Sequence, residues 1–326
     1  MRLITLTPIY FSGYKLFLFL SPALIVPIII TYARAYQGKF NFRIFLPALM
    51  LLYLIFQWYL FEISIANEIG RIIPPLLLFS LAKNINCDFR RICQIVTFIV
   101  LFDTFYRIAI HPELILTNPL SDRIYSFKNT SSIFFFDSNL MALYALFVLV
   151  LTRNNAVRSI LFICIYLSFS RAAYAMLLIF WLANYFPYFS KKTRMILAFL
   201  IICVFAYCLN MLFEFVAQDN SGRTKLLIME VAFDYLSNHL LFGIGSGEFK
   251  NNFILASHTL VGLLAELGLI GMILVIFPIL YYTFSTRFKE IYTLNAVILI
   301  GGTFGMFPIA YIGWYYVLIE SYTRGY

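Results

Sequence analysis

The chain has 326 residues, of which 62% are hydrophobic and only 12% charged, with a formal net charge of +9. Soluble domains are about 45–50% apolar and about 25% charged, so the composition excludes a soluble globular enzyme and a disordered or fibrous protein. A surface this apolar indicates that lipid, rather than water, surrounds most of the folded chain. The distribution of the basic residues between loops therefore indicates the orientation of the chain in the membrane. We expect no nucleic-acid partner.

Long, unbroken apolar runs predict an all-α fold, a single polytopic transmembrane helical bundle over residues 1–326. A spanning helix needs about 20 apolar residues, so about 10 or 11 spans fit in the chain. A β-barrel is not expected, because its strands would alternate apolar and polar residues. The predicted spans lie at about 13–33, 44–61, 66–82, 92–110, 138–152, 157–169, 172–187, 195–214, 258–282, 291–307 and 309–320.

The basic residues of the predicted loops gather in every second connection. This set comprises Arg34, Lys39, Arg43, Lys83, Arg90, Arg91, Arg153, Arg158, Lys191, Lys192, Arg194, Arg287, Lys289 and Arg324. By the positive-inside rule these connections are cytoplasmic, which puts the C-terminus inside and the long loops 111–137 and 215–257 outside. We expect no cleaved signal peptide, because the N-terminus lacks an A-x-A cleavage site.

The outer loop 215–257 contains a segment in which charged residues are interspersed with a mainly apolar side. This pattern predicts an amphipathic helix from about 223 to 241 that lies along the outer membrane interface. The stretch GIGSGEF follows, and its glycines allow the backbone to approach another group closely. It matches neither a dinucleotide fingerprint nor a P-loop, so we expect no nucleotide-driven domain.

Ionisable residues at membrane depth are functional candidates, because burying a charge in lipid is expensive. Asp103 and Arg107 are spaced i, i+4 and share a helix face, so they form either a self-satisfying ion pair or part of a polar pathway. Glu68 and Arg71 are spaced i, i+3 in the least regular predicted span, which also contains Pro74 and Pro75. For this second pair we favour a structural role.

Three further charged positions gather on the predicted outer side. Arg171 lies in the tight turn SFSRAAYAM, where it either snorkels to the headgroups or faces an anionic ligand. Arg223 precedes the predicted interfacial helix and is either a solvated loop charge or a second ligand for the same anion. His258 has Glu266 eight residues later on the same helical face, so it is either a hydrogen-bonded helix-start residue or an orientable general base.

Arginines near one histidine favour an anionic substrate, because the guanidinium fork matches phosphate oxygens bidentately. The sequence has no HExxH motif, no cysteine cluster and no dense acidic pair, so we expect no metal and no other cofactor. The five cysteines are scattered among apolar residues and fit packing roles. A lipid-linked phosphate or pyrophosphate fits these residues, and so does an anionic polysaccharide.

Four segments, in this order, resemble the O-antigen polymerase and O-antigen ligase superfamily of bacterial envelopes. They are FFFDSNLMALYALFVL (134–149), LSFSRAAYAMLL (167–178), SGRTKLLIMEVAFDYLSNHLLFGIGSGEF (221–249) and SHTLVGLLAELGLIGMIL (257–274). Together they cover about a third of the chain, and each motif is degenerate. The chain departs from the family at Thr259, since the histidine of the family is usually followed by asparagine.

The resemblance implies a metal-independent, inverting glycosyl transfer at the periplasmic face of the bacterial inner membrane. The donor would be a glycan on undecaprenyl pyrophosphate. By position in the motifs, Arg171 and Arg223 would bind the pyrophosphate, and His258 would take the proton from the acceptor hydroxyl. The other candidates for substrate binding are Glu266, Arg107 and Arg123, although Arg123 and Lys128 are better explained as solvated loop charges.

The function expected from these observations is a polymerase of O-antigen, or of a related capsule or exopolysaccharide, in lipopolysaccharide or polysaccharide biosynthesis. It would transfer the chain to the next lipid-linked repeat unit. The close alternative is an O-antigen ligase that transfers the finished chain to lipid A–core. A flippase for the same lipid-linked oligosaccharide is the alternative from another class, and Asp103 with Arg107 favours it. Expected partners are the undecaprenyl-linked oligosaccharide, membrane lipids and a chain-length regulator protein.

Overall fold

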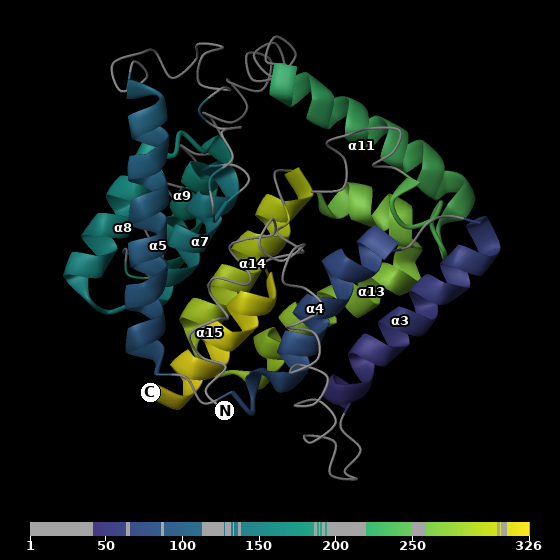
Figure 1. Ribbon diagram of the computed structural model, residues 1–326, viewed down its shortest axis with the longest axis horizontal. Coiled ribbons are helices and arrows are strands. Elements are labelled where there is room, and N and C mark those ends of the chain that lie inside the picture. Colours follow the sequence, from purple (N-terminus) through teal and green to yellow (C-terminus); the bar gives the residue numbers. More distant parts are fainter. Residues whose placement is uncertain are drawn as a thin grey trace.

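The computed structural model describes residues 42–62, 66–85, 88–112, 127, 132, 134–135, 138–185, 188, 190, 193, 220–248, 259–304, 307 and 312–325. These residues contain ten long helices and no strand (Figure 1), which confirms the all-α prediction for the described part of the chain. The helices are α3 (Phe42–Phe61), α4 (Ala66–Ala82), α5 (Phe89–Ile110), α7 (Ser138–Leu151), α8 (Asn155–Leu167), α9 (Arg171–Tyr185), α11 (Asn220–His239), α13 (Leu260–Ser285), α14 (Lys289–Phe304) and α15 (Ile312–Gly325).

Each predicted span within the described residues overlaps a helix, and the predicted span 66–82 has the bounds of α4. The predicted spans at 13–33 and 195–214 lie outside the described residues. Helices α3, α5 and α13 are long and apolar enough to cross a membrane, whereas α7, α8 and residues 172–182 of α9 are apolar but shorter. These helices are compatible with a membrane protein.

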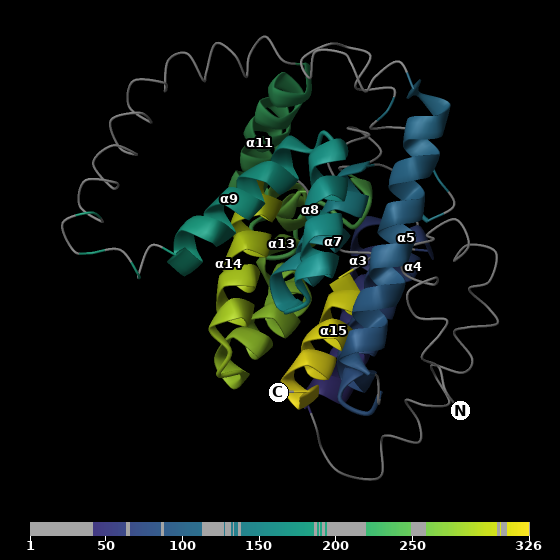
Figure 2. The same ribbon diagram turned by 90° about the vertical axis from the view of Figure 1, so that its left-hand side faces the viewer.

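The helices form two groups with α14 and α15 between them (Figures 1 and 2). One group packs α5, α7 and α8 together, and the other packs α3, α4 and α13 together. Helix α15 contacts both α4 and α5, while α14 contacts both α9 and α13. Nearly every side chain of α7 is buried, as expected for a helix that is hydrophobic on all sides, and α15 is buried from Ile312 to Ile319.

The outward faces of the peripheral helices carry large exposed apolar side chains. They include Leu52 and Tyr59 on α3, Phe98 and Phe105 on α5, and Phe162 and Ile163 on α8. Soluble monomers rarely expose contiguous apolar surface on this scale, so these faces suit contact with lipid.

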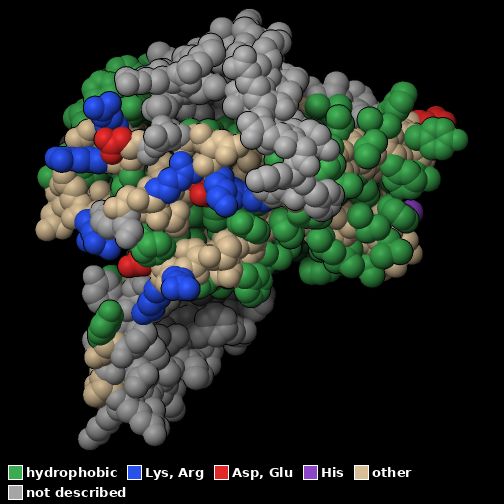
Figure 3. All heavy atoms as spheres, turned by 90° about the horizontal axis from the view of Figure 1, so that it is seen from below, with side chains coloured by type: hydrophobic (Ala, Val, Ile, Leu, Met, Phe, Trp, Pro, Cys, Tyr) green, Lys and Arg blue, Asp and Glu red, His purple; other side chains and the backbone are tan. Residues whose placement is uncertain are grey.

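Eight cations whose side chains the structure describes as exposed belong to helix ends that lie together at one end of the bundle, where α15 ends (Figures 1 and 3). They are Lys83, Arg90, Arg91, Arg153, Arg158, Arg287, Lys289 and Arg324. Arg324 joins the end of α15 to the end of α4, since it donates to the carbonyl oxygens of Ala82, the last residue of α4, and of Ile85. We call this end the basic end, and the described members of the predicted basic set face it together.

Arg43 is an exception, because it is buried in the first turn of α3 and is not a loop cation. Its guanidinium pairs with Glu320 of α15 at 2.8 Å, and donates to the hydroxyl of Tyr282 at 2.9 Å and the carbonyl of Phe79 at 2.7 Å. The charge thereby joins α3, α4, α13 and α15 near the basic end. Hydropathy alone placed Arg43 in a connection, because its position follows directly on a polar stretch.

Candidate functional site

The turn before Arg171 is held by three serine hydroxyls. Ser138 of α7 donates to the carbonyl of Ser168 at 2.9 Å, and the Ser168 hydroxyl accepts the amide of Ser170 at 3.2 Å. The Ser170 hydroxyl accepts the amide of Ala173 at 3.3 Å, in the manner of a helix N-cap. Arg171 is thus the first residue of α9, at the end of the bundle opposite the basic end; its side chain lies outside the described part.

Arg223 lies at the start of α11 and His258 precedes α13 in the sequence, and these two helices pack against each other. Arg223 lies in the first turn of α11, although the description covers its backbone only. The buried residues Ile228 and Ala232 of α11 form an apolar cluster with the first half of α13. His258 lies outside the described residues, but it precedes Thr259, whose hydroxyl caps α13 by accepting the amide of Gly262 at 3.0 Å.

The end of α14 links the starts of α9 and α13. A Cβ added at Gly301 would lie 1.9 Å from the Cε of Met176, one turn after the start of α9. A Cβ at Gly302 would lie 3.1 Å from the Cδ1 of Leu260, the first residue of α13. The two small residues therefore allow α9, which starts at Arg171, and α13, which starts two residues after His258, to approach one helix end.

Arg107 and Asp103 form a fully buried ion pair of 2.7 Å on α5. The guanidinium also donates to the carbonyl oxygens of Phe127 and Phe135, each at 3.3 Å, and Ser132 donates to the second oxygen of Asp103. The pair therefore anchors the described residues of the loop 111–137 against α5. This arrangement favours the structural interpretation of the pair.

Substrate binding by Arg107 stays a prediction, and Arg123 lies outside the described residues. The anchored loop also reaches the turn that precedes Arg171, because the rings of Phe127 and Phe169 meet edge to face with centroids 5.5 Å apart.

Glu266 is fully buried and is part of a charge cluster that the sequence did not indicate. Its Oε2 lies 3.1 Å from Nη2 of Arg71, and the same nitrogen lies 2.5 Å from Oε2 of Glu68. The i, i+3 spacing predicted the Glu68–Arg71 pair correctly. The link to Glu266 joins residues 195 positions apart, and no local pattern reveals such a pair.

Helix α13 is broken at Gly268, which has φ 62° and ψ −174°. The glycine turn after α11 docks at this break, because the amide of Ile244 donates to the carbonyl of Ala265 at 2.9 Å and that of Gly245 donates to Glu266 at 3.1 Å. Close backbone approach by the GIGSGEF glycines is confirmed, and the group approached is α13. The sequence predicted an uninterrupted span here, so the break is a correction to that expectation.

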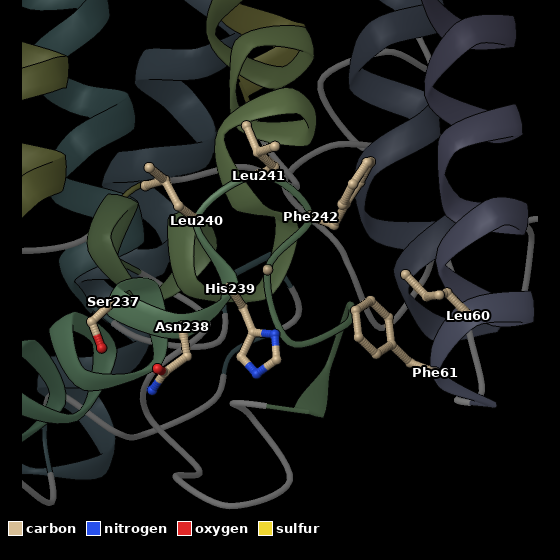
Figure 4. Close-up of a pocket in the computed structure, with 9 residues that line it drawn as sticks. Leu60, Phe61, Ser237, Asn238, His239, Leu240, Leu241 and Phe242 are labelled. Atoms are coloured by element: carbon tan, nitrogen blue, oxygen red, sulfur yellow. The ribbon is translucent and has the colours of Figure 1, made fainter.

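A hollow lies between the ends of α3 and α11 (Figure 4). Leu60 and Phe61 line one side, and residues 237–243 line the other. The exposed ring of His239 lies among these residues, so the hollow combines an apolar wall with one titratable side chain. No motif in the sequence distinguishes His239, which lies in the last turn of α11.

Within the described ranges, no group of three or more His, Cys, Asp or Glu side chains could hold a metal ion. Comparison with known proteins found no matching family model, no matching curated protein and no matching solved structure. The assignment of function therefore rests on the residues and their arrangement.

Proposed function

We propose that this protein is a polysaccharide polymerase of the bacterial inner membrane. It transfers a growing glycan from undecaprenyl pyrophosphate to the next lipid-linked repeat unit at the periplasmic face, with inversion and without a metal. The observation that supports the proposal is the common location of the starts of α9, α11 and α13 at the end of an apolar helical bundle opposite its basic end (Figure 1). Arg171 and Arg223 lie in the first turns of α9 and α11, and His258 comes two residues before α13 in the sequence.

The chemistry needs a ligand for a pyrophosphate leaving group and a base for the acceptor hydroxyl. Arg171 and Arg223 supply guanidinium groups that bind phosphate oxygens bidentately and stabilise the charge that develops as pyrophosphate leaves. His258 accepts the proton of the attacking sugar hydroxyl, a contribution typically worth 10²–10⁴-fold in rate. Pyrophosphate is a good leaving group, so two arginines can replace a divalent cation.

The distribution of charge supports the orientation. The exposed lysines and arginines at the basic end favour a cytoplasmic location for that end by the positive-inside rule. The catalytic end then faces the periplasm, and the remaining predicted spans complete a multi-pass bundle. Helix α11 carries exposed apolar residues at Leu226, Leu227 and Phe233, which suit a helix lying along the outer membrane interface.

The test is the glycan profile of a strain that lacks this protein. We expect lipid A–core to carry a single repeat unit, with long chains absent from both the lipid A and the undecaprenyl pools. Long chains on undecaprenyl pyrophosphate beside a bare lipid A–core would identify an O-antigen ligase, which would transfer the finished glycan to lipid A–core. Repeat units that accumulate on the cytoplasmic leaflet would instead identify a flippase.

The flippase is the second candidate because the chain buries charges at membrane depth. Transporters use such charges to line a pathway, and they commonly place the substrate at broken helices. In this chain Asp103 and Arg107 pair with each other, Arg107 also donates to two loop carbonyls, and Asp103 accepts from the hydroxyl of Ser132. These contacts favour the polymerase over the flippase.

A further inference from the structure

The break at Gly268 leaves backbone groups of α13 without partners in their own helix. At membrane depth each unsatisfied amide or carbonyl costs several kcal/mol, so a broken span persists only where other groups replace the lost bonds. Here the amides of Leu269 and Ile270 donate to the carbonyl oxygens of Leu240 and Leu241, at 2.8 and 3.2 Å. The segment from Leu240 to Gly245 therefore satisfies both sides of the break, since the amides of Ile244 and Gly245 donate to the first half of α13.

Helix α3 reinforces this junction from the other side. Gln57 donates from Nε2 to the carbonyl oxygens of Phe242 and Glu266, at 2.7 and 3.1 Å. The hydroxyl of Tyr53 donates to the carbonyl of Leu267, and Ser246 of the turn donates to Oε1 of Gln57. These contacts join α3, α13 and the glycine turn into one buried unit.

A charged link attaches the same unit to α4. Arg71 lies between Glu68 and Glu266, and Glu266 is the residue whose carbonyl accepts from both Gly245 and Gln57. Glu68 in turn lies against the glycine turn, since a Cβ added at Gly247 would be 3.5 Å from its Oε1. Arg71 thus holds the first half of α13 and the glycine turn in a fixed relation.

We propose that Arg71 and Glu266 are positioning residues for the transfer reaction, an inference that rests on the proposed function. The glycine turn follows α11, whose first turn carries Arg223, and the first half of α13 begins two residues after His258. The Arg71–Glu266 pair therefore sets how the segment with the pyrophosphate ligand lies against the segment with the base. Loss of the Arg71–Glu266 pair would misalign the pyrophosphate ligand and the base while leaving both residues in the chain.

The test uses the full chain in lipid nanodiscs with a lipid-linked repeat unit as substrate. Arg71→Lys keeps the positive charge but removes the guanidinium whose Nη2 meets both carboxylates, and Glu266→Gln keeps an acceptor but removes the charge. We expect kcat to fall about tenfold or more in both variants, because small misplacements of reacting groups are costly, while KM for the donor changes far less. The exchanged pair, Arg71→Glu with Glu266→Arg, should recover part of the loss.

Arg43→Lys is the matched control. Arg43 is equally buried and is paired with Glu320 across the bundle, but it lies near the basic end. Hydrogen–deuterium exchange supplies a readout that needs no activity. Arg71→Lys should raise exchange at the amides of Ile244, Gly245, Leu269 and Ile270, and Arg43→Lys should leave these amides protected.

The outcomes separate the two proposals. An active wild-type protein whose Arg71→Lys variant keeps its kcat, or loses no more than Arg43→Lys, overturns the positioning role alone. Unchanged exchange at the four amides in Arg71→Lys overturns it as well. A folded wild-type protein that extends no chain refutes the proposed function, and the positioning role for transfer falls with it.

Discussion

The contact between Gly243 and Gly268 gives the sharpest prediction about stability. Both residues have positive φ, at 70° and 62°, and each lies against the backbone of the other segment. A Cβ at position 243 would lie 2.4 Å from the carbonyl oxygen of Glu266 and 2.5 Å from the nitrogen of Gly268. Backbone atoms in a packed junction cannot move aside, so Gly243→Ala forces the glycine turn off the broken helix.

The cost of Gly243→Ala follows from three effects. The left-handed backbone conformation costs an alanine about 1–2 kcal/mol. Overpacking adds about 1–3 kcal/mol, and the amide bonds of Ile244 and Gly245 to α13 are worth about 1 kcal/mol each. The expected loss in the free energy of unfolding is therefore roughly 4–7 kcal/mol.

The matched controls are glycines with progressively fewer constraints. Gly247 has φ 87° but meets only the side chain of Glu68 at 3.5 Å, so Gly247→Ala should lose about 1–2 kcal/mol from the backbone alone. Gly325 has nothing within 4 Å of an added Cβ, and Gly325→Ala should be neutral. Denaturant unfolding of the purified chain in nanodiscs measures all three. Equal stability of Gly243→Ala and Gly325→Ala would refute the account of the junction.

Three further outcomes are expected. Asp103→Asn leaves the buried guanidinium of Arg107 with a neutral partner and should cost about 3–5 kcal/mol, with faster proteolysis of the loop 111–137 as the local readout; an unchanged cleavage rate would show that the pair does not anchor the loop. Ser138→Ala removes the hydrogen bond to the Ser168 carbonyl and should cost about 1 kcal/mol of stability, together with a drop in chain extension. Full activity of this variant would show that Ser138 does not support the position of Arg171. Chain extension should survive EDTA, and a loss of activity that magnesium restores would exclude the metal-free mechanism.

Hydropathy predicted the helices well, because apolar run length is a local property. The bounds of α4 were predicted despite Pro74 and Pro75, and the helix before the GIGSGEF turn begins only three residues earlier than expected. The i, i+3 and i, i+4 ion pairs were also predicted, since helical spacing alone brings such side chains together.

The features that the sequence did not reveal depend on tertiary contacts. A glycine within an apolar run does not distinguish a continuous helix from a broken one. At the break in α13, the backbone around Gly243 packs directly against Gly268. The pairing of Arg71 with Glu266 joins helices that are distant in sequence. A buried arginine requires partners, which for Arg43 are Glu320 and Tyr282 on distant helices. No local pattern identifies these partners, so the sequence predicts a loop position for Arg43.

Chain extension by the purified protein tests the central claim most directly. The full chain is reconstituted in liposomes with an undecaprenyl-pyrophosphate-linked repeat unit and EDTA, beside equally expressed His258→Ala, Arg171→Ala and Arg223→Ala variants. The account predicts polymer of several repeats from the wild-type protein and a loss of at least about 100-fold without the base. Extension that persists in all three variants, or a folded wild-type protein that makes no polymer, would contradict it.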